Sequence, residues 1–417
     1  MRTLLKIFGI LVVVLAGVFA ANVYLQVDNR VSGDEVQNRP IVNAVSITRL
    51  DSTVVTADSV TKFIGQLTKQ FNITGLAISI INRGDLVYQE YFGLRNKQKN
   101  EPFARNTILY SASFSKTILA DITFQLVEEG KLSMDTPLYQ YLREPLPEYR
   151  TNIMQQFFGA NHYDYSDLAD DSLYKKVTPA MCLTHTTGLP NWRWLEPDGK
   201  LKFKFQPGER YSYSGEGMFL LQLALEVITG KDFEELSVEK IFRPMNLSQS
   251  SFVWQRSYEG HYAVGHDING NSLGIPKPNV PNAAGSLSTT LEDFTAHFTD
   301  VLSQKQERYR IMTTRQISIP FKRQFGPEAD VETHENARIG LSYGFGYGVY
   351  QTPFGRAFFK EGHGDGWQHY AVGFPGSQTA LVIMSNSDNA EGAFKALIEF
   401  TLGNPYTPWF WEGYDPK

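Results

Sequence analysis

The order of β-rich and helical segments along the chain restricts its fold more than any other feature. GLAISIIN (75–82) and LVYQEYFG (86–93) flank Arg83-Gly84-Asp85, which is the pattern of a β-hairpin. Toward the other end, four β-rich runs are separated by glycine and proline: SYGFGYGVYQT, GRAFFKEG, QHYAVGFP and TALVIMSNS (342–387). Helical patterns occupy the middle. We therefore expect an α+β fold in which an antiparallel sheet, built from both ends of the chain, is flanked by helices and carries an inserted helical subdomain.

The first 26 residues predict export of the rest of the chain. Arg2 and Lys6 precede an uncharged run from Ile7 to Gln26, which is typical of a signal peptide or of a short membrane anchor. In both cases the positive flank stays inside. We therefore expect a periplasmic or otherwise extracytoplasmic body, either released by cleavage or attached to the inner membrane through residues 7–25.

The remainder divides into a linker, one folded domain and a tail. Residues 27–50 lack clear periodicity and are expected to be the linker. Residues 51–404 hold the predicted strands and helices, with the helical subdomain at about 121–335, and residues 405–417 form an aromatic tail. Because Cys182 is the single cysteine, no internal disulfide can stabilise the domain.

Composition excludes one class of partner. The formal net charge is −5, and no stretch of the chain is rich in lysine and arginine. A nucleic-acid-binding protein is expected to carry a basic patch. We therefore expect no nucleic acid among the partners of this chain.

Ser113 and Lys116, in ILYSASFSKTILA (108–120), are the first candidates for catalysis. Their three-residue spacing places both side chains on one face of a helix. A lysine amine kept partly neutral by burial can activate a serine hydroxyl. The chain has three other Ser-x-x-Lys pairs, but small and apolar residues surround this one, so its desolvation costs least. The alternative is a serine N-cap followed by a solvated lysine.

Two later segments supply further candidates. Tyr213, in PGERYSYSG (207–215), enters an apolar helical run, where its hydroxyl either points into a cleft or is satisfied in the core. In Gly362-His363-Gly364-Asp365-Gly366, three glycines indicate backbone that another group approaches closely. A backbone N–H there, which we place at Gly366, can pair with the Ser113 N–H to hold a carbonyl oxygen that gains negative charge. The alternative is a tight turn with an exposed histidine.

A metal site is the competing interpretation of the same histidines. His363, Asp365 and His369 lie close together in the sequence, and His266-Asp267 can add ligands. No His-Glu-x-x-His pattern is present, however, and strand alternation places His363 and Asp365 on one face, whereas His369 is expected to lie past a bend. We therefore expect neither metal nor cofactor, and keep a metallohydrolase as an alternative.

Together these segments resemble the serine β-lactamase and penicillin-binding protein superfamily, specifically its class C-like branch with esterases and D-amino-acid peptidases. Besides Ser113-x-x-Lys116, CLTHTTGLPNW (182–192) resembles that branch's LLTHTSGLP segment, and residues 207–215 resemble its PG-x-x-F-x-YSN segment. NAAGSLSTTLEDF (282–294) resembles AGGL-x-ST-x-x-D, and GHGDG (362–366) stands where the family has Lys-Thr-Gly or His-x-Gly. The resemblance implies a β-lactamase/transpeptidase-like fold.

The resemblance also implies a mechanism. Ser113 is the expected nucleophile, Lys116 its proton acceptor, and Tyr213 the relay of a proton toward the leaving group. His363 belongs to the third catalytic element, and water hydrolyses the resulting acyl-enzyme. The implied partner is a small ester, amide or peptide, with cell-wall fragments among the candidates, and no cofactor is implied.

Departures from the family pattern bear on the substrate. Gly215 stands where the family commonly has asparagine, so an amide that contacts the substrate is missing. Asp365 replaces a glycine, and His363 supplies less fixed charge than lysine, so a substrate carboxylate is disfavoured. We therefore expect an esterase or small amidase/peptidase. The alternatives are a β-lactamase or D-alanyl-D-alanine carboxypeptidase, and a slowly acylating penicillin-binding sensor.

Overall fold

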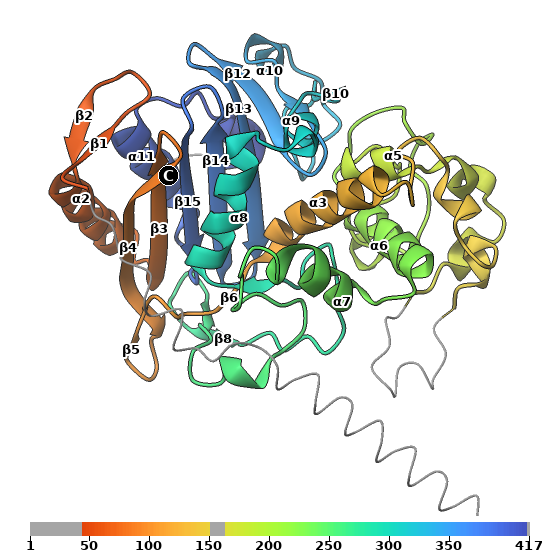
Figure 1. Ribbon diagram of the computed structural model, residues 1–417, viewed down its shortest axis with the longest axis horizontal. Helices are drawn as coiled ribbons and strands as arrows, with labels where there is room; N and C mark the ends of the chain where they lie inside the picture. Colours follow the sequence, from red (N-terminus) through yellow and green to blue (C-terminus); the bar gives the residue numbers. More distant parts are fainter. Residues whose placement is uncertain (1–43, 151–162, 415–417) are drawn as a thin grey trace, which may run out of the picture.

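The computed structural model describes residues 44–150 and 163–414 (Figure 1). The expected signal peptide or anchor (1–26) and most of the expected linker (27–50) lie outside the described residues. Within the described part, no helix combines the length and the apolar character needed to cross a membrane.

A nine-stranded antiparallel sheet forms the centre of the molecule and confirms the predicted layout. Strand β15, from the end of the chain, pairs with β3, from its beginning, in the register Ala380↔Ile81 to Ser385↔Leu76. The strands in spatial order are β10 (Ile317–Ser318), β11 (Ser342–Tyr343), β12 (Gly348–Thr352), β13 (Gly355–Gly364), β14 (Trp367–Phe374), β15 (Thr379–Ser385), β3 (Gly75–Asn82), β4 (Asp85–Asn96) and β5 (Glu101–Pro102).

Both faces of the sheet are covered, which explains why β3 is buried from Gly75 to Ile81. Successive side chains of a strand point to opposite faces. Ile78 and Ile80 have the same parity and lie in the core between the sheet and the terminal helices, whereas Ala77 and Ile81 lie in the core on the other face. The turn before β4 takes Arg83 at φ 54° and Gly84 at φ 85°, as a tight hairpin requires.

The first face carries helices from both ends of the chain. α2 (Ala57–Gln70) begins at Thr56, whose hydroxyl accepts a hydrogen bond from the Ser59 N–H, and its buried residues recur at helical spacing. α11 (Glu391–Leu402) packs beside it, with Phe63 stacked on Phe400. The described part of the aromatic tail, including α12 (Trp409–Glu412), packs on this face as well, where Tyr370 donates a hydrogen bond to Glu412.

The opposite face carries the helical part of the molecule (Figure 1). α8 (Leu291–Ser303) lies on β3 and β15, and α3 (Ser115–Glu128) runs from the sheet into the helical region. The remaining strands and α-helices are β1 (Ser46–Thr48), β2 (Val54–Thr56), β6 (Leu109–Tyr110), β7 (Gly265–His266), β8 (Ser272–Gly274), β9 (Ser288–Thr289), α5 (Pro179–Leu183), α6 (Gly215–Thr229), α7 (Phe233–Ser237), α9 (Glu307–Met312) and α10 (Glu335–Arg338). The expected helical subdomain at 121–335 thus includes α8, a helix packed directly on the sheet.

Candidate active site

Ser113 lies at the point where the sheet meets α3. It belongs to a short 3-10 turn, Ala112–Phe114, that leads directly into α3, and Ala112 before it has a φ of 46°. Lys116 is 1% exposed, and its Nζ atom lies 2.9 Å from Ser113 Oγ and 2.6 Å from the Ala284 carbonyl oxygen, to which it donates. The structure therefore brings together the serine and lysine that the sequence pairs.

The surroundings of Lys116 favour its neutral amine. Burial is the main cause that lowers the pKa of Lys116 well below its usual range, and the positive charge of Lys360 lowers it further, while Glu361 opposes the shift. A neutral amine has a lone pair that can accept the Ser113 hydroxyl proton. The pair can thus supply both a nucleophile and its base.

Tyr213 lies beside this pair, as expected. It precedes Ser214, whose side chain caps α6 by accepting from the Gly217 N–H, and the Lys116 Nζ lies 5.1 Å from the centroid of the Tyr213 ring. His185 stacks on the Tyr213 ring with centroids 4.1 Å apart, and its Nδ1 accepts from the Ser214 N–H at 3.0 Å. Burial raises the pKa of Tyr213, so the phenol keeps its proton in the resting site.

Lys360 also belongs to this site, although it was not among the residues expected there from the sequence. Its side chain is buried, and its Nζ donates to the Tyr213 hydroxyl at 3.3 Å and to the Glu361 carbonyl oxygen at 2.9 Å. Burial lowers the pKa of Lys360, but Glu361 and Tyr213 raise it by a larger amount, so the ammonium form is favoured. One tyrosine is therefore flanked by two lysines whose pKa values are shifted in opposite directions.

His363, by contrast, is directed elsewhere. Its Nδ1 lies 2.6 Å from Glu391 Oε1 at the start of α11, and its side chain is 57% exposed. The hydrogen bond to Glu391 raises the pKa of His363. Since Lys360 contacts Tyr213 and is separated from His363 by three positions, strand alternation places the two side chains on opposite faces of β13.

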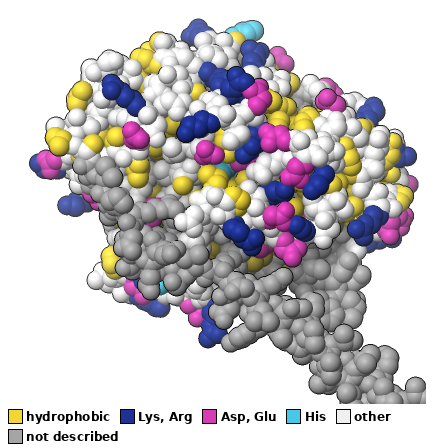
Figure 2. All heavy atoms as spheres, viewed as in Figure 1, with side chains coloured by type: hydrophobic (Ala, Val, Ile, Leu, Met, Phe, Trp, Pro, Cys, Tyr) yellow, Lys and Arg dark blue, Asp and Glu magenta, His cyan; other side chains and the backbone are white. Residues whose placement is uncertain are grey.

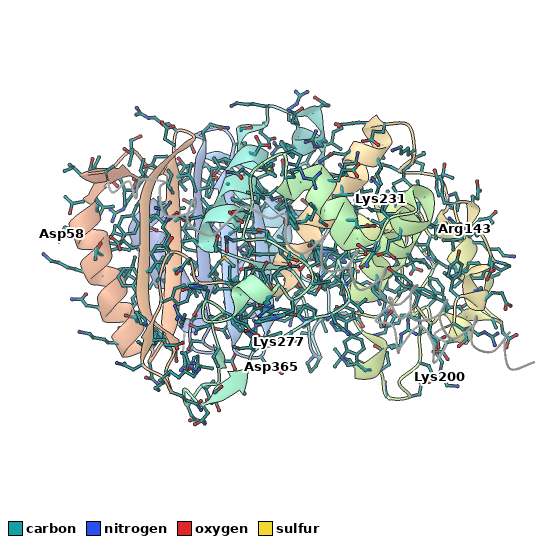
Figure 3. The ribbon with its side chains drawn as sticks, turned by 60° about the horizontal axis from the view of Figure 1, so that its bottom comes forward. Asp58, Arg143, Lys200, Lys231, Lys277 and Asp365 are labelled. Carbon is teal, nitrogen blue, oxygen red and sulfur yellow. The ribbon has the colours of Figure 1, made fainter. Side chains whose placement is uncertain are left out.

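The other two residues expected at this turn are also engaged away from Ser113. The Gly366 N–H donates to Asp388 Oδ1 at 2.7 Å, so it is already used. Asp365, labelled in Figure 3, is exposed. Its charge acts on Tyr110, whose pKa is raised to about 12, mainly by burial.

A different part of β13 approaches the nucleophile. β12 pairs with β13 only as far as Phe359, so the edge of β13 beyond it faces the turn that holds Ser113. A Cβ added to Gly362 would lie 2.8 Å from the Ser111 carbonyl oxygen, closer than such atoms can pack. Glycine at this position therefore allows the strand edge to reach the nucleophile.

The space beside Gly215 is occupied by a neighbouring side chain. A Cβ at Gly215 would lie 2.7 Å from the Trp192 ring and 2.8 Å from the Asn191 carbonyl oxygen. The tryptophan therefore occupies the space next to Gly215 where the family's asparagine side chain begins. The adjacent Glu216 forms an ion pair with Arg193 at 2.9 Å.

The histidines considered for a metal site each form hydrogen bonds with other partners. His369 lies 2.8 Å from the Tyr110 carbonyl oxygen through Nε2, while its Nδ1 accepts from the Ser385 N–H. His266 accepts from the Lys97 N–H. Across residues 44–150 and 163–414, no three histidine, cysteine or acidic side chains gather in a way that could hold a metal ion.

Comparison with known proteins identifies the family. The family model described as beta-lactamase matches residues 60–402, which is most of the chain. The chain belongs to the beta-lactamase family. This confirms the resemblance stated from the sequence and the expectation of a β-lactamase-related serine hydrolase.

Relatives within the beta-lactamase family carry several names. A teichoic acid D-alanine hydrolase of Staphylococcus aureus (strain MRSA252) is 24% identical over 60% of this chain, and the match spans only 58% of that relative's length. A beta-lactamase of Pseudomonas fluorescens is 23% identical over 80% of this chain and 87% of its own.

Solved structures support the fold. The octameric penicillin-binding protein homologue from Pyrococcus abyssi aligns with a TM-score of 0.66 and 23% identity, over 85% of this chain and 79% of its own. The D-alanine carboxypeptidase AmpC from Burkholderia cenocepacia aligns with a TM-score of 0.61 and 19% identity, over 79% of this chain and 93% of its own. At these identities the structures establish the beta-lactamase-family fold alone.

The position of Lys360 changes which residues of this chain correspond to the family's Lys-Thr-Gly element. From the sequence resemblance, this element is expected at 362–366, with His363 as its basic residue. The structure instead brings Lys360 to Tyr213, so we assign the element to Lys360-Glu361-Gly362. The Lys-x-Gly spacing at 360–362 could have identified this element in the sequence. The glycine-rich stretch that follows it offers a second, competing match to the family pattern.

Proposed function

We propose that this chain is an exported serine hydrolase that cleaves small esters, or small amides and peptides, through an acyl-enzyme on Ser113. The observation that carries the proposal is the 2.9 Å approach of the buried Lys116 amine to the Ser113 hydroxyl. Export is supported by the N-terminal sequence.

The chemistry follows from the groups around Ser113. The Ser113 oxygen attacks the substrate carbonyl carbon while its proton passes to Lys116. Backbone N–H groups of Ser113 and of the 362–364 edge hold the developing oxyanion. The alcohol or amine leaves with a proton relayed through Tyr213, and water then hydrolyses the acyl-enzyme, which releases the acid and restores the serine.

The expected preference for esters rests on Trp192 and on Gly215, which lies close to Tyr213 in the sequence. Trp192 fills the space at Gly215, so the site lacks the amide that contacts an acyl-amide group in the family. The S. aureus relatives are named teichoic acid D-alanine hydrolases, which makes D-alanyl esters the first cell-wall-related substrates to test. His363 and Asp365 do not support this preference, because His363 is bonded to Glu391 and Asp365 is exposed.

A second candidate function has an observation of its own. Lys360 places an ammonium ion at the Tyr213 hydroxyl, and such a charge favours substrates that carry a carboxylate. This supports a β-lactamase or D-alanyl-D-alanine carboxypeptidase as the alternative. A slowly acylating penicillin-binding sensor would use the same groups and differ in the rates of acylation and deacylation.

Steady-state assays of the purified full chain can separate these functions. The panel comprises p-nitrophenyl acetate, a D-alanyl ester, nitrocefin and a D-alanyl-D-alanine peptide, with Ser113→Ala as the control. We expect turnover of the esters that exceeds turnover of nitrocefin and disappears in the control. Rapid nitrocefin hydrolysis without esterase activity would overturn the ester preference. A label that attaches to Ser113 and never turns over would favour the sensor.

A further inference from the structure

Several titratable groups surround Lys360 and Glu361, and burial favours the neutral form of most of them. They are Lys116, His185, Tyr211, Tyr213, Tyr343, Glu412 and Tyr414. Burial raises the pKa of each of these tyrosines and of Glu412, which favours their protonated, neutral forms. Burial also lowers the pKa of His185, whose Nδ1 accepts a hydrogen bond. Glu361 is the acidic side chain that forms an ion pair with Lys360.

The Glu361 side chain is held in place for this role. It is 5% exposed, and its Oε1 lies 3.5 Å from Lys360 Nζ. The same oxygen accepts a hydrogen bond from Gln324 Nε2 at 2.6 Å. The Gln324 backbone N–H in turn donates to the Trp411 carbonyl oxygen at 2.9 Å, which ties the arrangement to the C-terminal tail.

We propose that Glu361, held by Gln324, is a positioning residue that keeps Lys360 an ammonium ion directed at the Tyr213 hydroxyl. The inference rests on the proposed function and adds to it a residue that departs from the family pattern, because Lys-Thr-Gly has threonine at this place. A buried ammonium without a counter-charge tends to lose its proton. Glu361 acts through Lys360 and contacts neither Ser113 nor Tyr213 by a hydrogen bond.

The consequence is a specific pH dependence. The active form has Lys116 neutral and Lys360 charged, so loss of the Lys360 proton defines the alkaline limb of kcat/KM. Neutralising Glu361 removes the main interaction that raises the pKa of Lys360. The alkaline limb is then expected to move to lower pH by on the order of one unit. A residue with a merely structural role would lower activity without moving this limb.

The experiment compares three substitutions in the full chain. Glu361→Gln removes the charge and nearly keeps the shape, Glu361→Asp keeps the charge, and Glu335→Gln removes an exposed charge on α10 as the matched control. For each, kcat/KM for p-nitrophenyl acetate and the rate at which a fluorophosphonate labels Ser113 are measured against pH. We expect the alkaline limb to fall in Glu361→Gln, to recover largely in Glu361→Asp and to stay unchanged in Glu335→Gln.

The outcomes separate this inference from the proposed function. If the wild type labels at Ser113 and Glu361→Gln, though folded, keeps the wild-type limb within about 0.3 pH unit, the role of Glu361 is overturned and the hydrolase remains. If the wild type neither turns over esters nor labels at Ser113, both are overturned. If Glu361→Gln does not fold, Glu361→Thr replaces it with the same expected shift.

Discussion

The Nζ atom of Lys360 lies 3.3 Å from the hydroxyl of Tyr213, in a buried site next to Ser113. Lys116 approaches the same tyrosine, with its Nζ 5.1 Å from the ring centroid. The two amines differ in their surroundings, because Lys360 has the Glu361 carboxylate beside it and Lys116 has a carbonyl oxygen and a hydroxyl. This difference assigns the base to Lys116 and the fixed positive charge to Lys360.

Removal of the nucleophile or its base should abolish turnover. We expect Ser113→Ala and Lys116→Met each to lower kcat by about three orders of magnitude or more, because the two residues act as one unit. The double variant should lose little more than either single one. Ester hydrolysis and fluorophosphonate labelling measure the effect, with circular dichroism to check folding. Additive losses in the double variant would contradict the shared role.

The acid limb of the pH profile should report on Lys116. Its amine must be neutral to act, so kcat/KM should fall as the pH drops through the lowered pKa of Lys116. Because the Lys360 charge contributes to that lowering, Lys360→Met should move the acid limb to higher pH by on the order of one unit. The measurement is kcat/KM against pH for both proteins, and an unmoved limb would show that the two lysines are not coupled.

Lys360 and His363 should differ sharply in their importance. Lys360→Met removes the ammonium at Tyr213, and we expect kcat/KM for esters to fall by about 10- to 100-fold. His363→Ala breaks a largely exposed contact with Glu391 and should change it by less than about threefold. Parallel assays of both variants test the assignment of the Lys-Thr-Gly element. A large loss in His363→Ala with little effect of Lys360→Met would restore the assignment to 362–366.

Gly362 should be required for the approach of β13 to the nucleophile. In Gly362→Ala, the new methyl group meets the Ser111 carbonyl oxygen, so the strand edge must move away from Ser113. A displacement on the scale of 1 Å is expected to cost about 100-fold in kcat/KM. Gly376→Ala is the matched control, because its Cβ would find only one atom, 3.9 Å away. Equal activity of the two variants would contradict the close approach.

Replacing Gly215 with the asparagine that is common in the family should destabilise the protein. Gly215→Asn forces a side chain against Trp192 and the Asn191 carbonyl oxygen, and we expect it to lower the free energy of unfolding by about 1–3 kcal/mol. Trp192→Ala removes the ring, so Gly215→Asn should cost less stability in that background. Urea denaturation of the four proteins measures the coupling. Equal costs in both backgrounds would show that the ring does not fill this space.

The nucleophile pair could be predicted because its evidence is local. Ser113 and Lys116 lie one helical turn apart, and the apolar residues around them already indicate burial. The hairpin at 75–93 and the late strands were equally readable, since alternation and turn residues act over short distances. Tyr213 was placed beside the serine only through the resemblance, because nothing near it in the sequence refers to residue 113.

The amino-acid sequence by itself determined the pairing of Ser113 with Lys116 and a sheet made from both ends of the chain, since these follow from helical spacing, burial and strand patterns. Only the tertiary structure decided between Lys360 and His363. The two are three positions apart on one strand, so they face opposite sides, and the side that meets Tyr213 depends on how β13 pairs with β12 and β14. Pairing between distant segments decides that register, and no local pattern in the strand encodes it.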